Sequence, residues 1–187
     1  EEIEAGAPAH VFTSGTMENP QMLTRAGRSG PVTLFVRNRV CALVRDDVVV
    51  GTATLLERML ADDVKLGTAA PENDPAGQYA FDVFRKADAV RPGARATLES
   101  KALRLVSTTR SCYPPGLRNI YGMLLADRKA DIFLTLCTNA LASIRENPSQ
   151  RLISLPDTLA VSADYGVTVL TGAPTSAQSF VDYILSP

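Results

Sequence analysis

Cysteine and histidine are both scarce in this sequence of 187 residues, and their scarcity limits the chemistry that the chain can carry. The three cysteines, Cys41, Cys112 and Cys137, are too few and too irregularly spaced for a disulfide framework or a metal cluster. Cys41 lies within the apolar run at residues 40–44 and is expected to be a buried thiol. Cys112 and Cys137 could pair only if the fold brought them together, and an odd count leaves at least one cysteine free.

An excess of charge of either sign is also missing. The 19 basic and 20 acidic residues nearly cancel, which argues against a general nucleic-acid surface, because such surfaces usually show a basic excess. A small anion site is not excluded, since it needs local hydrogen-bond donors rather than net charge. No apolar run approaches the roughly 20 residues that span a bilayer, and we find no internal repeat, low-complexity tract or DNA-binding helix-turn-helix. With 45% hydrophobic residues, the chain can bury a substantial core as one domain or two small lobes.

The most informative stretch is residues 72–80, ENDPAGQYA, which follows a short apolar strand and opens an amphipathic helix. Asp74 is a good N-cap, and Pro75 suits the first helical position. The backbone N–H groups of a first helical turn have no partner inside the helix, and the positive end of the helix dipole lies behind them, so Ala76 and Gly77 form a potential anion site. The alternative is that Asp74 only caps the helix and Gly77 only eases a tight turn.

Two further helix starts carry polar residues suited to an anion. Arg118 and Asn119 lie near the start of a helix expected over residues 117–125, where a cation opposes the helix dipole and a bound anion would relieve the mismatch. An exposed, solvated arginine is the alternative. Thr138 and Asn139 begin the helix that follows the next strand, and they are further candidates for the same site.

The strand-to-helix turn at residues 137–139 must also be considered as a possible catalytic site. Cys137, beside Thr138 and Asn139, could be a nucleophile activated by the helix N-terminus. The only histidine, His10, lies far away in the sequence, directly before a strand expected to be buried, and histidines in such places are mostly structural. We therefore expect a protein that is not an enzyme and that has no catalytic residues.

The order of the expected elements sets the fold class. Strands alternate with helices along the chain, which predicts an α/β fold with largely parallel sheets flanked by helices. Periodicity alone supports this class and no finer description.

Six segments together resemble one known family, and they occur in the family's order over nearly the whole chain. They are residues 5–12 (AGAPAHVF), 37–40 (RNRV), 74–80 (DPAGQYA), 130–133 (ADIF), 164–170 (DYGVTVL) and 180–187 (FVDYILSP). In these segments the sequence resembles the periplasmic molybdate/tungstate-binding proteins of ABC importers. The resemblance implies a two-lobed periplasmic-binding-protein-like fold of type II, in which each lobe is a mostly parallel sheet flanked by helices and the ligand cleft lies between the lobes.

The resemblance also implies a division of the chain and a role. Residues 1–36 and 166–187 would form a first lobe that is incomplete at its N-terminus, and residues 37–165 would form the second lobe with the crossing strands. The ligand would be a tetrahedral oxyanion such as molybdate or tungstate. The protein would then bind metal only as part of this oxyanion and would have no metal-ligating residues. An ABC permease in the membrane would be the partner of a monomeric, periplasmic receptor without a cofactor.

Two departures from the family's pattern bear on the ligand. The family's serine-bearing N-terminal loops, which donate to the oxyanion, are not within the sequence, and no signal peptide is expected at its start. Leu136 stands where many members have a tyrosine, and Leu136 cannot donate a hydrogen bond. Thr138, Asn139 or Tyr121 could supply the missing donor. A receptor for another small anionic solute and a ligand-sensing regulatory domain are therefore the alternatives, ahead of a cysteine-dependent enzyme.

Overall fold

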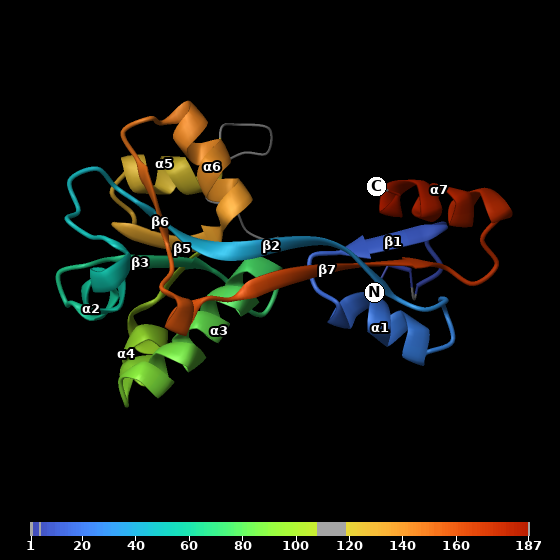
Figure 1. Ribbon diagram of the computed structural model, residues 1–187, viewed down its shortest axis with the longest axis horizontal. Coiled ribbons are helices and arrows are strands. Elements are labelled where there is room, and N and C mark those ends of the chain that lie inside the picture. The colour runs from blue at the N-terminus through green and yellow to red at the C-terminus, as the bar shows by residue number, and fades with distance from the viewer. Residues whose placement is uncertain (1, 4, 108–118, 187) are drawn as a thin grey trace. The chain divides into compact units, whose positions relative to one another are not determined.

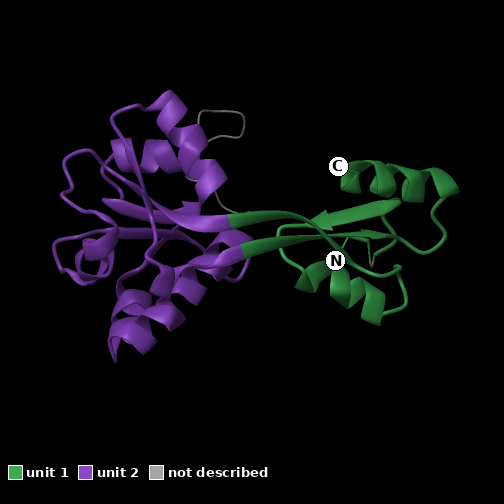
Figure 2. Ribbon diagram, viewed as in Figure 1, with its two compact units in different colours: residues 1–38, 163–187 green, residues 39–162 purple. Residues whose placement is uncertain are grey.

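The computed structural model describes residues 2–3, 5–107 and 119–186, and these residues form two compact units. Unit 1 comprises Glu1–Asn38 and Ala163–Pro187, and unit 2 comprises Arg39–Ser162 (Figure 2). The chain passes from unit 1 to unit 2 within one strand and returns at the start of another, so both ends of the chain belong to unit 1.

Unit 1 contains a short antiparallel pairing with a helix against it. Its elements are β1 (Val11–Ser14), α1 (Glu18–Arg25), the first part of β2 (Thr33–Val44), most of β7 (Ser162–Val169) and α7 (Thr175–Leu185) (Figure 1). β1 pairs with β7 from Val11 opposite Val169 to Ser14 opposite Gly166. A Cβ atom on Gly166 would lie 2.8 Å from Cγ of Pro20 in α1, so this close approach of helix and strand requires glycine.

Unit 2 is built on a mixed sheet with helices between its parallel strands. Its strands run in the order β2, β5, β3, β4, and β6 pairs with the other side of β2. The strands are β3 (Leu66–Ala69), β4 (Leu103–Val106), β5 (Ile132–Leu136) and β6 (Arg151–Ser154), and the helices are α2 (Leu55–Leu60), α3 (Pro75–Val90), α4 (Ala94–Lys101), α5 (Ile120–Ala126) and α6 (Cys137–Glu146), with short 3-10 turns at Thr52–Thr54 and Asp157–Leu159. The alternation confirms the predicted α/β class.

The strand directions correct one detail of the prediction. β3 is parallel to both β4 and β5, as expected for strands joined through helices. β2 pairs antiparallel with β5 and β6, and β1 pairs antiparallel with β7 in unit 1. Among these pairings, the parallel ones are β5–β3 and β3–β4. A chain that leaves one unit and later returns to it must run in both directions. The sheets that contain its crossing strands therefore include antiparallel pairs.

The core of unit 2 lies between α3 and the sheet. Val83, Phe84 and Ala87 on α3 are fully buried, as their helical spacing predicts, and they belong to one apolar cluster with Leu66 of β3 and Leu134 of β5. This packing fixes α3 on the strand that precedes it. None of the described helices is both long and apolar enough to cross a membrane.

The cysteines pair differently from the prediction. Cys41 forms a disulfide with Cys137 across 96 residues of sequence, with a Cα–Cα distance of 4.9 Å. The expectation that Cys41 is a buried thiol is therefore wrong, and Cys137 is not the partner of Cys112, which lies outside the described residues. The cause is the register between β2 and β5: Cys41 lies directly opposite Thr135, so Cys137 is its diagonal neighbour on the same face.

Candidate ligand-binding site

Two helices of unit 2 begin at the same edge of its sheet. β3 and β5 are adjacent and parallel, β3 leads through residues 70–74 into α3, and β5 leads into α6 without a loop. In open α/β sheets, the carboxyl ends of parallel strands and the helix N-termini that follow them are where ligands bind. The candidate residues Ala76, Gly77, Thr138 and Asn139 all lie in the first turns of these two helices.

The start of α3 is capped as its sequence predicts. Asp74 has extended backbone angles, Pro75 is the first helical residue, and Oδ1 of Asp74 accepts a hydrogen bond from the Ala76 N–H at 2.8 Å. The Gly77 N–H donates to the Asp74 carbonyl at 2.9 Å. Both N–H groups therefore have acceptors within the chain, so an anion could bind Ala76 only by sharing or replacing the Asp74 carboxylate.

Gly77 is required for packing at this point. A Cβ atom there would lie 2.6 Å from the Ala69 carbonyl oxygen and 2.7 Å from the backbone nitrogen of Pro71. These contacts are with backbone atoms at the end of β3, which cannot move aside as a flexible side chain could. The close approach of α3 to the strand therefore accounts for glycine here without a ligand.

Asp74 also sets the electrostatics of this helix start. Its burial raises the pKa of the carboxyl group above the ordinary value, and the hydrogen bond from the Ala76 N–H opposes part of that rise. An ionised Asp74 cancels part of the positive potential at the helix N-terminus. The α3 start is therefore a weaker anion site than its free helix dipole would suggest.

The start of α6 is held by a local hydrogen bond and by a covalent link to a distant strand. Its N-cap residue, Leu136, makes no side-chain capping bond. Instead, Asn139 Nδ2 donates to Thr135 Oγ1 at 3.2 Å, and Cys137 is joined to Cys41. Thr138 is exposed in the same turn. The first turn of α6 is thus anchored through Asn139 and Cys137, and the positive end of the helix dipole lies behind it.

Asn119 joins α5 to α6. Its Oδ1 accepts from the backbone N–H groups of Tyr121 and Gly122 at 3.2 and 3.4 Å, which makes it the N-cap of α5. Its Nδ2 donates to the Asn139 carbonyl at 3.1 Å, and its backbone N–H donates to Glu146 at 2.8 Å. The structure thus brings together two predicted site residues, Asn119 and Asn139. Arg118 lies outside the described residues.

The residues proposed to replace the missing tyrosine hydroxyl, Thr138, Asn139 and Tyr121, lie around Leu136 and α6. Leu136 is buried, with 7% of its surface exposed, and Tyr121 packs its ring edge-on against Phe133 with a centroid distance of 5.2 Å. The sequence interpretation did not single out Thr135 or Cys41 as supports of this turn. Thr135 lies only four residues before Asn139, so their bond is local. The link to Cys41 depends on the register of β2 on β5, which is a tertiary property.

Thr68 is a further polar residue that the sequence interpretation passed over. It lies in β3, it is fully buried, and its Oγ1 has no hydrogen-bond partner among the described residues. An unpaired buried hydroxyl costs about 1–3 kcal/mol. A threonine in a short apolar strand gives no sequence signal of such a state, because threonine is a common strand residue.

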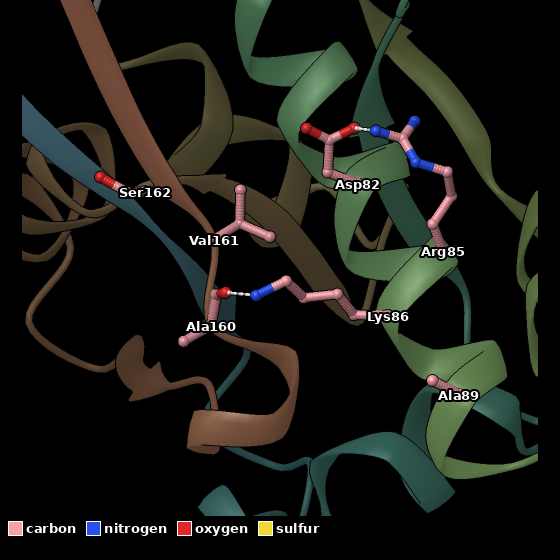
Figure 3. A pocket seen from close by; sticks show the side chains of 7 residues that line it. All are labelled: Asp82, Arg85, Lys86, Ala89, Ala160, Val161 and Ser162. Atoms are coloured by element: carbon pink, nitrogen blue, oxygen red, sulfur yellow. Dashed lines mark hydrogen bonds and ion pairs between the residues drawn. The ribbon is translucent and has the colours of Figure 1, made fainter.

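Figure 3 shows a surface pocket of about 480 Å³ beside α3. It is lined by Asp82, Arg85, Lys86 and Ala89 of the helix and by residues 160–162. Lys86 Nζ donates to the Ala160 carbonyl, and Arg85 pairs with Asp82. Both cations thus already have partners, and the Lys86 bond attaches α3 to the segment that enters β7.

A second pocket, of about 400 Å³, is lined mainly by charged side chains that form ion pairs. Arg45 binds Asp131 at 2.7 Å and also Asp47, and Asp131 accepts from the backbone N–H of Lys65 at 2.8 Å. Arg58 pairs with Asp63 across the same pocket. No cluster of three or more potential metal-ligating side chains occurs in the part of the chain that the structure describes.

The sequence as a whole identifies the family. Residues 1–187 match the sequence model of a family described as bacterial extracellular solute-binding protein. The chain belongs to this family. An uncharacterized protein of Pasteurella multocida (strain Pm70), PM1146, is 26% identical over 184 residues, which are 98% of this chain and 75% of that protein.

Solved structures of solute-binding proteins share its fold. The periplasmic molybdate-binding protein of Azotobacter vinelandii is 15% identical with a TM-score of 0.68, over 100% of this chain and 76% of that chain. The sulfate-binding protein SubI of Mycobacterium tuberculosis H37Rv is 13% identical with a TM-score of 0.71, over 99% and 66%. PEB3 with bound L-phospholactate, a protein of Campylobacter jejuni, is 12% identical with a TM-score of 0.68, over 98% and 76%.

These similarities confirm the predicted family and the two-lobed α/β fold of the periplasmic solute-binding type. They indicate a binding role rather than a catalytic one. The structure also removes the cysteine-nucleophile alternative, because the sulfur of Cys137 is held in a disulfide and is not available as a thiolate.

Proposed function

We propose that the protein is the extracytoplasmic receptor of an ABC importer and that it binds a tetrahedral oxyanion, with molybdate and tungstate as the first candidates. The second-lobe wall of the site comprises the first turns of α3 and α6, with Ala76, Gly77, Thr138 and Asn139. Arg118 and Asn119, before α5, complete the proposed set.

The observation that carries the proposal is the pair of helix N-termini at the ends of adjacent parallel strands. α3 has 16 residues and α6 has 10, so each is long enough to have a helix dipole behind its first turn. At α3 the anion would have to share the Ala76 N–H with the Asp74 carboxylate or replace that carboxylate. A tetrahedral dianion that leaves water needs neutral or positive donors to replace its hydration. Backbone N–H groups at a helix start supply such donors without an obligatory counter-cation.

The disulfide supports the proposed location. Disulfides persist in oxidising compartments such as the bacterial periplasm and are rare in the cytosol. The Cys41–Cys137 bond and the extracellular family description therefore agree with a periplasmic receptor. A permease that reads the closed, liganded form would be its membrane partner, and we expect the receptor itself to be a monomer.

A receptor for another small anionic solute is the second candidate. Leu136 lacks the hydroxyl that molybdate-binding members use, and the Asp74 carboxylate occupies the Ala76 N–H. Similar structures include a sulfate-binding protein and a protein with bound L-phospholactate. These observations favour testing sulfate, phosphate and an organic phosphate beside the metal oxyanions.

Thermal unfolding with excess anion tests the proposal. A ligand at a thousand times its dissociation constant stabilises a protein by about 4 kcal/mol, which for this chain length raises the melting temperature by about 10 °C. A shift of this size with molybdate and tungstate, and none with sulfate, supports the first candidate. A shift with phosphate or L-phospholactate alone supports the second. No shift with any anion, in protein carrying the family's N-terminal loops, contradicts oxyanion binding.

A further inference from the structure

The first turn of α6 depends on partners elsewhere in the fold. α6 begins directly at the end of β5, and Leu136 offers no side-chain cap. Among the described residues, Asn139 Nδ2 donates to Thr135 Oγ1, and Asn119 Nδ2 donates to the Asn139 carbonyl. The first bond lies within the segment that begins α6, and the second joins that segment to the N-cap of α5.

The disulfide adds an anchor of a different kind. Cys41 is only 3% exposed, and it lies in the ladder opposite Thr135 of β5 on one side and Ser154 of β6 on the other. It therefore belongs to the interior of the sheet and cannot follow a movement of α6. Cys137 is the first residue of α6, directly before Thr138 and Asn139. The covalent bond thus ties the proposed ligand-binding turn to a fixed point in the sheet.

We infer that the Cys41–Cys137 disulfide is a positioning element of the ligand site, which holds the N–H groups of the α6 first turn in their binding geometry. This inference rests on the proposed function of that turn. Its consequence is that full affinity for the anion develops only in an oxidising compartment. The reduced chain binds weakly, so a chain that has not been exported does not sequester the solute.

Reversible reduction tests the inference without a change of sequence at the bond. A Cys112→Ser background leaves Cys41 and Cys137 as the only cysteines. Tris(2-carboxyethyl)phosphine supplies the two electrons and becomes the phosphine oxide with an oxygen from water, and the two sulfurs become thiols. Molybdate affinity is then measured by calorimetry on the oxidised, reduced and re-oxidised protein. Because one hydrogen bond to a charged group is worth about 1.5–3 kcal/mol, we expect affinity to fall about tenfold to a hundredfold on reduction and to recover on re-oxidation.

Hydrogen exchange provides the readout that a loss of general stability would not reproduce. In protein without added anion, reduction should speed exchange of the amides of residues 141–143, whose helical acceptors are the carbonyls of the first turn of α6, and leave the amides of residues 80–87 in α3 unchanged. Leu98→Ala, which creates a cavity in the core at α4, is the matched control. It should lower the melting temperature to a similar extent without selective exchange at α6 or loss of affinity.

The outcomes separate this inference from the proposed function. If the oxidised protein binds molybdate and the reduced protein binds it equally well, the inference is wrong and the proposed function stands. If the oxidised protein binds no molybdate, the proposed function fails for that anion, and the exchange experiment alone decides the positioning role. Uniform exchange changes in α3 and α6, or a Leu98→Ala variant that loses affinity to the same degree, would overturn the inference.

Discussion

Asp74 offers a direct test of how the α3 start is stabilised. Its side chain has two opposing effects on stability. Oδ1 caps the helix through the Ala76 N–H. Partial burial of the carboxyl group disfavours its ionised form and so raises its pKa. Asp74→Asn keeps an acceptor oxygen but cannot ionise, whereas Asp74→Ala removes the cap. Comparison of the two variants separates the hydrogen bond from the charge.

The sign of the pH dependence follows from the raised pKa. A folded state that raises a carboxyl pKa binds the proton more tightly than the unfolded state does. The protonated carboxyl group therefore contributes its full stabilisation at pH values below the unfolded pKa, near 3.8. That contribution is lost as pH rises through the higher folded pKa. Above the folded pKa, the wild-type protein therefore bears the cost of the buried charge. Asp74→Asn avoids this cost and is expected to be at least as stable as wild type at pH 7, with its advantage vanishing below pH 4.

Asp74→Ala should behave differently. Loss of an N-cap costs about 1 kcal/mol, or about 2–4 °C in melting temperature for a chain of this length. Urea unfolding at a series of pH values between 3.5 and 7 measures both variants. If Asp74→Asn is instead less stable than wild type at pH 7 and the gap closes on acidification, the ionised carboxylate is stabilising. In that case its attraction to the helix dipole outweighs its burial, and the reasoning here is refuted.

Two further predictions concern the same wall of unit 2. Gly77→Ala should lower the free energy of unfolding by about 1–3 kcal/mol, because its methyl group would overlap the Ala69 carbonyl oxygen. Gln78→Ala, at an exposed position, is the control. Equal urea midpoints for the two variants would contradict the packing role of Gly77. Asn119→Ala should cost about 1–2 kcal/mol through loss of the α5 cap, whereas Asn119→Asp keeps the cap acceptor and loses only the donor to Asn139. Amide exchange in α6 faster in both variants than in wild type would check that link, and unchanged exchange would count against it.

Local signals in the sequence were sufficient to predict α3. Asp74 as N-cap, Pro75 at the first position and the spacing of Val83, Phe84 and Ala87 all act within a few residues, and the structure has each of them as expected. The α/β class follows from the same kind of signal. These features could be predicted because each depends on neighbours along the chain and not on how strands pair.

The cysteine pairing could not be predicted in this way. Whether Cys41 meets Cys137 depends on the register of β2 against β5, and a shift of one residue would turn Cys41 to the other face of the sheet. The antiparallel directions of β2 and β6 depend likewise on the path of the chain between the units. The role of Asn119 was missed in part for the same reason, because its bond to Asn139 joins two separate helices.

The two halves of the proposed ligand wall are therefore stabilised by different means. The α3 start is held by a local cap, so its properties should respond to pH and to substitutions within one helical turn. The α6 start has no side-chain cap and is held by a disulfide and by bonds to Thr135 and Asn119, so it should respond to reduction and to changes far away in sequence. If both helix starts contact one anion, acidification and reduction should change its affinity independently. Neutralising Asp74 removes a negative charge that repels the anion at α3, and reduction loosens the donors at α6. A reduced Asp74→Asn variant tests this independence. If the change in binding free energy equals the sum of the two single changes, the helix starts act separately, as expected from the bonds that Asp74 makes among the described residues, which stay within residues 70–78. A departure from the sum would show coupling through the shared anion.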